Sequence, residues 1–189
     1  MGEIGALKAV GYWRPSEEML RELECGYDVR RRKEIATQLA ARRKWQCHPL
    51  PDPACLVWAG WDPAELPNVL AYLRAGRVWI SFNGWSYCRF GCGIDPRALG
   101  DSDLTDGEWV WPEGLAHYAE THSVRLPDEF IDRMRSQGWR VPTEPIIPWV
   151  ELPAADRPQV DGTFWIAWSR RMGLSASAER DAATDQPRE

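Results

Sequence analysis

Apolar and polar residues follow two different periods along this chain, and the two periods predict both strands and helices. Short runs of aromatic and β-branched residues between turn-forming residues are typical of strands. They occur at residues 6–13, 56–58, 78–82, 85–90, 108–111, 146–150 and 163–168. Apolar residues three or four positions apart, next to capping residues, predict helices. These are expected just after Ser16 and at residues 29–45, 63–74, 113–121 and 127–138.

Three of the helices have clear start signals. The segment Asp62-Pro63-Ala64-Glu65 supplies a cap, a proline suited to the first helical position and the glutamate of a capping box. Pro112 is expected to end a strand and to start the next helix, because its fixed φ is already helical. Pro127, followed by two acidic residues, is expected to open a third helix.

The dipeptide Asn83-Gly84 predicts a β-hairpin between residues 78–82 and 85–90. Asn-Gly supplies the two positive φ angles of a type I′ turn, whose twist matches paired strands. In that register Trp79 faces Cys88 across the pair, so the Cys88 thiol is expected beside an indole ring.

Together these elements predict a single globular α+β domain over residues 1–174. We expect a small antiparallel sheet, built around the hairpin and the strand at 108–111, with helices packed on one face. A chain of 189 residues is long enough for one hydrophobic core. Residues 175–189 are small and charged, with almost nothing apolar to bury, and they are predicted to form a disordered tail.

The composition of the chain indicates where in the cell the protein is expected and which kinds of partner it could bind. The sequence has no run of about 20 apolar residues and no signal-peptide pattern at Met1–Gly5, so a cytoplasmic protein without membrane contact is expected. An odd number of cysteines, five, favours reduced thiols over a disulfide framework. A net charge of −5 argues against nucleic acid as a partner. Twelve tryptophans favour a thickly packed core, and they also fit an aromatic groove or a protein interface.

A cysteine pair and a histidine pair form the strongest candidate metal site. Three residues separate Cys88 from Cys92 and four separate His117 from His122, and such pairs can complete a tetrahedral zinc site. Helix geometry opposes this, because at about 100° per residue the two histidines point about 140° apart. Both are expected to reach one metal only if the helix unwinds before His122. The alternative is a partly buried His122 and an exposed or hydrogen-bonded His117.

Two weaker candidate sites also contain cysteine. Cys47-His48 with Cys55 lacks the paired spacing typical of zinc sites. A thiol-dependent enzyme would use Cys88 or Cys92 as nucleophile and His117 as base. The base would be oriented by an aspartate, for which the candidates are Asp103 and Asp106. The sequence has no nucleophile elbow, phosphate loop, dinucleotide fingerprint or His-Glu-x-x-His motif.

Three stretches of the chain have a distinctive sequence. They are Ser86-Tyr87-Cys88-Arg89-Phe90-Gly91-Cys92-Gly93, then Asp103-Leu104-Thr105-Asp106-Gly107-Glu108-Trp109-Val110-Trp111-Pro112-Glu113-Gly114-Leu115-Ala116-His117-Tyr118, and then His122-Ser123-Val124-Arg125-Leu126-Pro127. Together they resemble a family of small uncharacterised bacterial proteins over residues 56–135. The resemblance implies a bacterial source and a shared hairpin-helix core, and it brings no activity to carry over.

The sequence favours a non-enzymatic binding or interaction protein. This hypothesis rests on the surplus of aromatic residues, the acidic charge and the lack of a catalytic signature. The residues expected to contact a ligand or a protein partner are Trp85, Arg89, Trp109, Trp111, Glu113 and His117. The alternatives are a small zinc-binding protein that uses the Cys2His2 set and, after it, a thiol-dependent enzyme.

Overall fold

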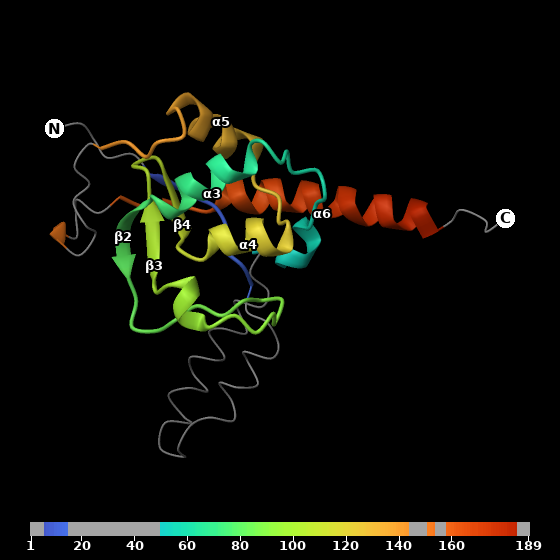
Figure 1. Ribbon diagram of the computed structural model, residues 1–189, viewed down its shortest axis with the longest axis horizontal. Coiled ribbons are helices and arrows are strands. Elements are labelled where there is room, and N and C mark those ends of the chain that lie inside the picture. The colour runs from blue at the N-terminus through green and yellow to red at the C-terminus, as the bar shows by residue number, and fades with distance from the viewer. Residues whose placement is uncertain (1–5, 15–49, 144–150, 154–157, 185–189) are drawn as a thin grey trace, which may run out of the picture.

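The computed structural model describes residues 6–14, 50–143, 151–153 and 158–184. In this part of the chain four α-helices pack against one mixed five-stranded sheet, which confirms the predicted α+β class (Figure 1). None of the described helices is both long enough and apolar enough to span a membrane.

The sheet has the strand order β2-β3-β4-β1-β5. Its strands are β1 (Leu7–Ala9), β2 (Arg77–Ser81), β3 (Ser102–Thr105), β4 (Trp109–Pro112) and β5 (Val160–Asp161). Strands β2, β3 and β4 run antiparallel, whereas β1 lies parallel to both β4 and β5. The predicted antiparallel sheet therefore forms one half of a mixed sheet.

A buried carboxylate shapes the tight turn between β3 and β4. Oδ1 of Asp106 accepts hydrogen bonds from the backbone N–H groups of Glu108 and Trp109, at 2.9 and 2.7 Å. Its Oδ2 accepts from the Tyr72 hydroxyl at 2.7 Å and lies 3.3 Å from Nε of Arg133. These partners satisfy a carboxylate that is almost fully buried, so the turn and the helices behind it are fixed together.

The helices lie on one face of the sheet, as predicted. They are α3 (Leu66–Arg74), α4 (Leu115–His122), α5 (Asp128–Ser136) and α6 (Thr163–Thr184). All four contribute buried residues to the larger core cluster, together with Trp109 and Trp111 of β4. Val110 points to the opposite face and packs with Leu7, Ala9, Trp79 and Leu152. The predicted core role of tryptophan is confirmed for the residues buried here, which are Trp79, Trp109, Trp111, Trp165 and Trp168.

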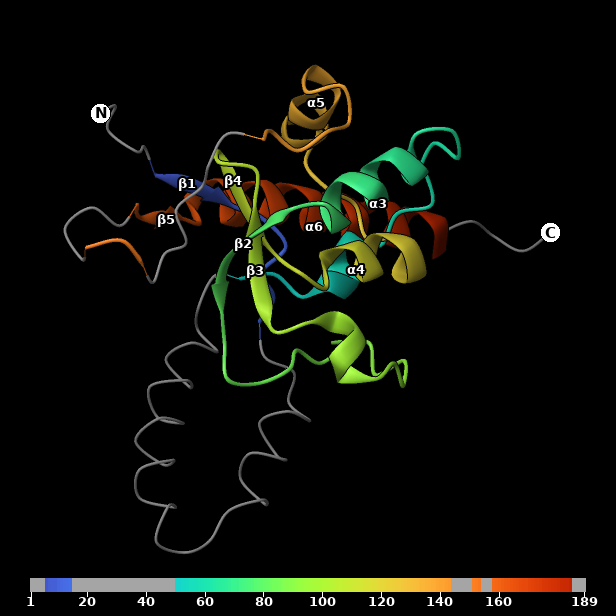
Figure 2. The ribbon, with the colours of Figure 1, turned by 60° about the vertical axis from the view of Figure 1, so that its left-hand side comes forward.

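The predicted Asn83-Gly84 hairpin is wrong. Strand β2 ends at Ser81 and pairs with β3, which begins at Ser102 after twenty intervening residues. Gly84 has a φ of 159°, which is extended backbone and not the left-handed conformation of a type I′ turn. The chain continues after β2 as a long connection, residues 82–101, that contains a short 3-10 helix at Pro96–Leu99 (Figure 2). Cys88 therefore does not pair across a strand with Trp79.

Two other predicted strands also differ from the structure. Residues 163–168 form the first turns of α6, whose N–H at Thr163 is capped by Oδ1 of Asp161 at 2.8 Å. Trp165 and Trp168 lie three positions apart on its buried side, which is a helical spacing. In the segment 56–58, Leu56 ends a 3-10 helix (Pro53–Leu56), and Val57 forms only an isolated bridge with Val124.

Several predicted elements fall outside the described residues. They are the helix after Ser16, the helix at 29–45 and the strand at 146–150. Helix α6 reaches into the segment 175–189 that the sequence predicts to be a disordered tail. The division of the chain into a domain and a tail stays a prediction.

Candidate metal centre

Helix α4 carries both histidines of the site. It begins after Gly114 and buries one side of its surface, with Leu115 and Tyr118 in the core. It ends immediately after His122, because Ser123 adopts a left-handed conformation with a φ of 51°. The buried face fixes the rotation of the helix about its axis, and this places both imidazoles toward the connection between β2 and β3.

The connection between β2 and β3 carries both cysteines. A turn closed by a 3.2 Å hydrogen bond from the N–H of Gly91 to the carbonyl of Cys88 brings the chain back on itself. Gly91 has a φ of 61°, and a Cβ built there would meet nothing within 4 Å. Glycine is therefore needed at this position for its backbone conformation and not for space. The turn brings Cys92 to the same side as Cys88.

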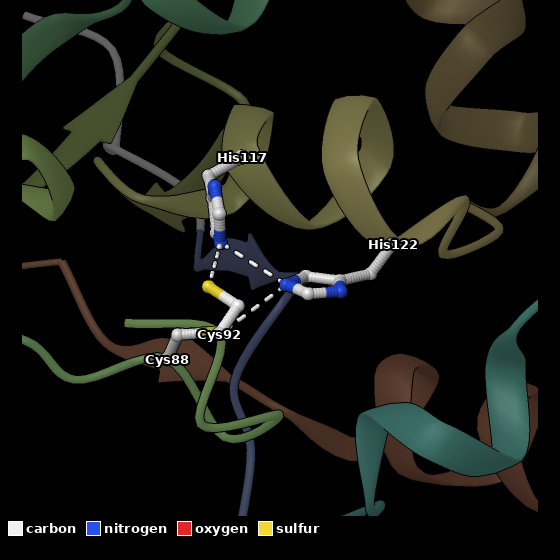
Figure 3. Close-up of side chains that lie close together, drawn as sticks. All are labelled: Cys88, Cys92, His117 and His122. Carbon is white, nitrogen blue, oxygen red and sulfur yellow. Dashed lines mark hydrogen bonds between the residues drawn. The ribbon is translucent and has the colours of Figure 1, made fainter. Parts of the chain in front are cut away.

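The side chains of these two segments converge (Figure 3). Sγ of Cys88 lies 3.2 Å from Nε2 of His122, and Sγ of Cys92 lies 3.5 Å from Nε2 of His117. The two Nε2 atoms are 3.2 Å apart. All four ligand atoms lie within 4.8 Å of one another. Four residues predicted as one set from the sequence are thus close enough together to hold a metal ion.

These separations are close to the edges of a zinc-centred tetrahedron. With Zn–S bonds of about 2.3 Å and Zn–N bonds of about 2.05 Å, tetrahedral angles place two nitrogens about 3.3 Å apart and a sulfur and a nitrogen about 3.6 Å apart. The same geometry places two sulfurs about 3.8 Å apart. In the structure the two nitrogens lie 3.2 Å apart, and the two closest sulfur–nitrogen pairs lie 3.2 and 3.5 Å apart, which is near these values. The donor set, two thiols and two imidazoles, is also the set that zinc prefers.

The expectation that α4 must unwind before His122 is wrong. The helix is continuous through His122, yet the two ring centroids are 4.9 Å apart. The 140° argument considers only the directions of the Cα–Cβ bonds. Each imidazole extends well beyond its Cβ, so two side chains that leave the helix from different sides can still bend toward a point beyond its surface (Figure 3).

A hydroxyl orients the ring of His117. Oγ1 of Thr121, one helical turn further along α4, lies 3.2 Å from Nδ1 of His117. An Nδ1–H that donates to this oxygen leaves the lone pair on Nε2, and Nε2 is the atom that faces the other three ligand atoms. Histidines that bind metals commonly have such a hydrogen bond on the second ring nitrogen.

An aromatic ring orients His122. The Phe90 ring stacks on the imidazole, with centroids 4.1 Å apart and an interplanar angle of 13°. Tyr118 holds the neighbouring backbone, because its hydroxyl accepts from the N–H of Arg89 at 3.0 Å and lies 3.4 Å from the carbonyl of Tyr87. The loop is thus attached to α4 through the residues around Cys88.

The electrostatic environment suits metal binding at neutral pH. Burial lowers the pKa of both imidazoles, and the neighbouring His122 lowers the pKa of His117 further. Both rings are therefore neutral at pH 7, which is the form that coordinates a metal. Burial raises the pKa of the Cys88 thiol against opposing backbone hydrogen bonds from Phe90 and Cys92, so a metal would displace a proton from Cys88.

The other predicted contact residues are scattered. Trp109 and Trp111 are only 2% and 0% exposed, so they belong to the core. Trp85 is half-exposed on the connection between β2 and β3. Arg89 lies on the same loop, where its side chain donates to the carbonyls of Arg14 and Tyr87. Glu113 is exposed at the end of β4.

The aspartates proposed to orient a catalytic His117 do not reach it. Oδ2 of Asp103 accepts from the Tyr12 hydroxyl at 2.8 Å, and Asp106 is engaged in the turn after β3. The partner of His117 Nδ1 is Thr121, so this part of the thiol-enzyme hypothesis is wrong. The pairing of Cys92 with His117 that it required does exist.

The second set of cysteines predicted from the sequence, Cys47-His48 with Cys55, is described only at Cys55. Cys55 is exposed and lies outside the four-residue cluster, while Cys47 and His48 lie outside the described residues.

Sequence reasoning missed Phe90, Tyr118 and Thr121 as supports of the site. Only Thr121 had a readable signal, because it stands four residues after His117 and so shares its side of a helix.

Comparison of the chain with protein-family models, with curated proteins and with solved structures finds no match. The resemblance to a bacterial family stays a prediction, and the chemistry of the site rests on its own geometry.

Proposed function

We propose that this chain is a zinc-binding protein in which Cys88, Cys92, His117 and His122 hold one Zn²⁺ ion. The observation that carries the proposal is the convergence of two Sγ and two Nε2 atoms within 4.8 Å. Ordinary packing gives no reason for two imidazoles to turn the same nitrogen toward each other and toward two thiols. A shared ion explains all of these orientations at once.

The proposed role of the ion is structural. Four protein ligands complete a tetrahedral zinc site and leave no position open for substrate or water, as in zinc sites that hold folds together. The ion would join α4 to the connection between β2 and β3. That connection contains twenty residues and no strand, so a cross-link at its middle would remove much of its conformational freedom.

The same loop supports the binding-protein hypothesis as a second candidate function. Its aromatic residues Phe82, Trp85 and Tyr87 are each about half exposed, at 50%, 49% and 49%. Exposed aromatic side chains close together in sequence are typical of contact surfaces. In this proposal the zinc ion orders the loop and the aromatic side chains meet the partner. A site of reduced thiols also fits the cytoplasmic location expected from the sequence.

Metal content of the purified full chain tests the zinc proposal. We expect one zinc ion per chain by elemental analysis and by native mass spectrometry, in protein prepared without a chelator. Cys92→Ser is expected to lose most of the zinc, and Cys55→Ser, which changes an exposed cysteine outside the cluster, is expected to keep it. Wild-type protein without zinc, or equal zinc in both variants, would contradict the proposal.

A further inference from the structure

The two cysteines of the cluster differ in their access to solvent. Cys92 is exposed, whereas Cys88 is half-buried. Cys88 lies beside His122, and the Phe90 ring stacks on that histidine. Cys92 lies beside His117. Among the described residues, the only rings that contact His117 are those of Tyr118 and His122, and neither stacks flat on it. A reagent in solution therefore has better access to Cys92 than to Cys88.

Two glycines next to Cys92 border open space. Gly91 and Gly93 both have positive φ, and a Cβ at either position would meet nothing within 4 Å. The chain on either side of Cys92 therefore has room to move, whereas Phe90 stays packed on His122. The two Sγ atoms lie within 4.8 Å of each other, and a disulfide bond, about 2.05 Å long, requires them to move closer.

We propose that Cys92 and Cys88 form an oxidation-sensitive pair, in which Cys92 reacts with a hydroperoxide and Cys88 then closes a disulfide. The inference rests on the proposed function, because binding to zinc keeps both sulfurs in the reactive thiolate form. Oxidation removes two of the four ligands of the ion. The disulfide state therefore releases zinc and removes the link that the ion makes between the loop and α4.

The reaction has two balanced steps. The Cys92 thiolate attacks one oxygen of hydrogen peroxide, the O–O bond breaks, and a sulfenic acid and hydroxide form. The Cys88 thiolate then attacks the Cys92 sulfur, the S–O bond breaks and a second hydroxide leaves. Two protons convert the hydroxides to water. The two sulfurs together lose two electrons, the peroxide gains two, and the zinc ion leaves as Zn²⁺.

Peptide mapping of the zinc-loaded full chain treated with hydrogen peroxide tests the pair. Arg89 stands between the cysteines, so trypsin places Cys88 on the peptide of residues 78–89 and Cys92 on that of residues 90–97. A disulfide links the two peptides with the loss of two hydrogen atoms. We expect this linked species to appear in step with zinc release, measured with a chromogenic chelator, and dithiothreitol to reverse it. A variant in which Cys25, Cys47 and Cys55 are serine is expected to behave identically.

The two proposals fail in different ways. The zinc content before oxidation tests the proposed function, whereas the linked peptide after oxidation tests the cysteine pair with or without metal. Zinc that stays bound while both cysteines remain reduced would overturn the oxidation proposal and leave the zinc site intact. Sulfinic acid on Cys92 without a link to Cys88 would also overturn it. Cys88→Ser is expected to leave a sulfenic acid on Cys92 that dimedone captures, and no capture would equally overturn the proposal.

Discussion

Phe90 lies flat against His122, with the two ring centroids 4.1 Å apart and the planes inclined by 13°. The contact joins a residue between the two cysteines to a histidine of the ligand set. The contact restrains both the orientation of the His122 ring and the position of the loop that carries Phe90. Stacking of this kind is worth about 0.5–1.5 kcal/mol beyond the area buried.

Replacement of Phe90 is therefore expected to weaken zinc binding without changing a ligand. We expect Phe90→Ala to lower zinc affinity about tenfold, because His122 and the loop lose their common support. Competition with a chromogenic chelator measures the affinity. The matched control is Phe82→Ala, which removes a half-exposed ring from the same connection and is expected to bind zinc as the wild type does. Equal affinities for the two variants would contradict the orienting role of Phe90.

The hydroxyl of Thr121 is expected to set which nitrogen of His117 binds the metal. Thr121→Val keeps the shape of the side chain and removes the oxygen that lies 3.2 Å from Nδ1. We expect zinc affinity to fall about tenfold to a hundredfold, as for other hydrogen-bond partners of metal-bound histidines. Thr121→Ser keeps the hydroxyl and should retain wild-type affinity. If the valine and serine variants bind zinc equally well, the hydrogen bond has no role in binding.

Asp103 is expected to make stability depend on pH. Burial raises its pKa to about 6, and the hydrogen bond from the Tyr12 hydroxyl opposes this only in part. The unfolded chain has an ordinary value of about 3.9, so the folded protein holds the proton more tightly. The stabilising contribution of this group is complete below about pH 4 and is lost as the pH rises through 6.

Asp103→Asn is expected to remove that loss. Relative to the wild type, the variant should gain about 2 kcal/mol in free energy of unfolding between about pH 4.5 and about pH 7.5. Urea denaturation of both proteins at the two pH values measures the difference, and any release of metal in acid is common to both. A difference in stability that stays constant with pH would show that Asp103 titrates normally.

Asp106 is expected to be among the most sensitive positions for folding. Its buried carboxylate accepts from two backbone N–H groups and the Tyr72 hydroxyl, and it pairs with Arg133. Asp106→Ala leaves these donors without an acceptor and should cost about 3 kcal/mol or more. The neighbouring acid Glu108 forms only partly exposed ion pairs, so Glu108→Ala should cost less than about 1 kcal/mol. Urea denaturation distinguishes the two, and similar losses would contradict this assignment.

Local sequence was sufficient to predict the described helices α3, α4 and α5, but neither α6 nor the pairing of the sheet. The spacing of Phe130, Ile131 and Met134 and the proline before them predict α5 from adjacent residues alone. The partner of β2 lies beyond a loop of twenty residues, which carries its own turn signal at Asn83-Gly84. At residues 163–168 the aromatic side chains favour a strand, whereas burial of Trp165 and Trp168 on one side requires a helix.

The candidate site could be predicted as a set of residues but not as a geometry. The spacing of Cys88 and Cys92 and of His117 and His122 singled out the four residues that the structure brings together, because zinc sites use such pairs. Directions of Cα–Cβ bonds alone argued against convergence. The four side chains converge because the imidazole rings extend beyond the helix surface and because the chain turns at Gly91. Neither feature can be derived from the spacing of residues in the sequence.

X-ray absorption at the zinc edge of the purified full chain tests the central claim most directly, because it reports the atoms bound to the metal. We expect two sulfur ligands at about 2.3 Å and two nitrogen ligands at about 2.0–2.1 Å, with the multiple-scattering signature of imidazole. Cys92→Ser should lose most of its zinc, and the zinc that it retains should have only one sulfur ligand, whereas Cys55→Ser should keep both sulfur ligands. A shell of oxygen and nitrogen alone, or no bound zinc, would contradict the claim that these four residues form a metal centre.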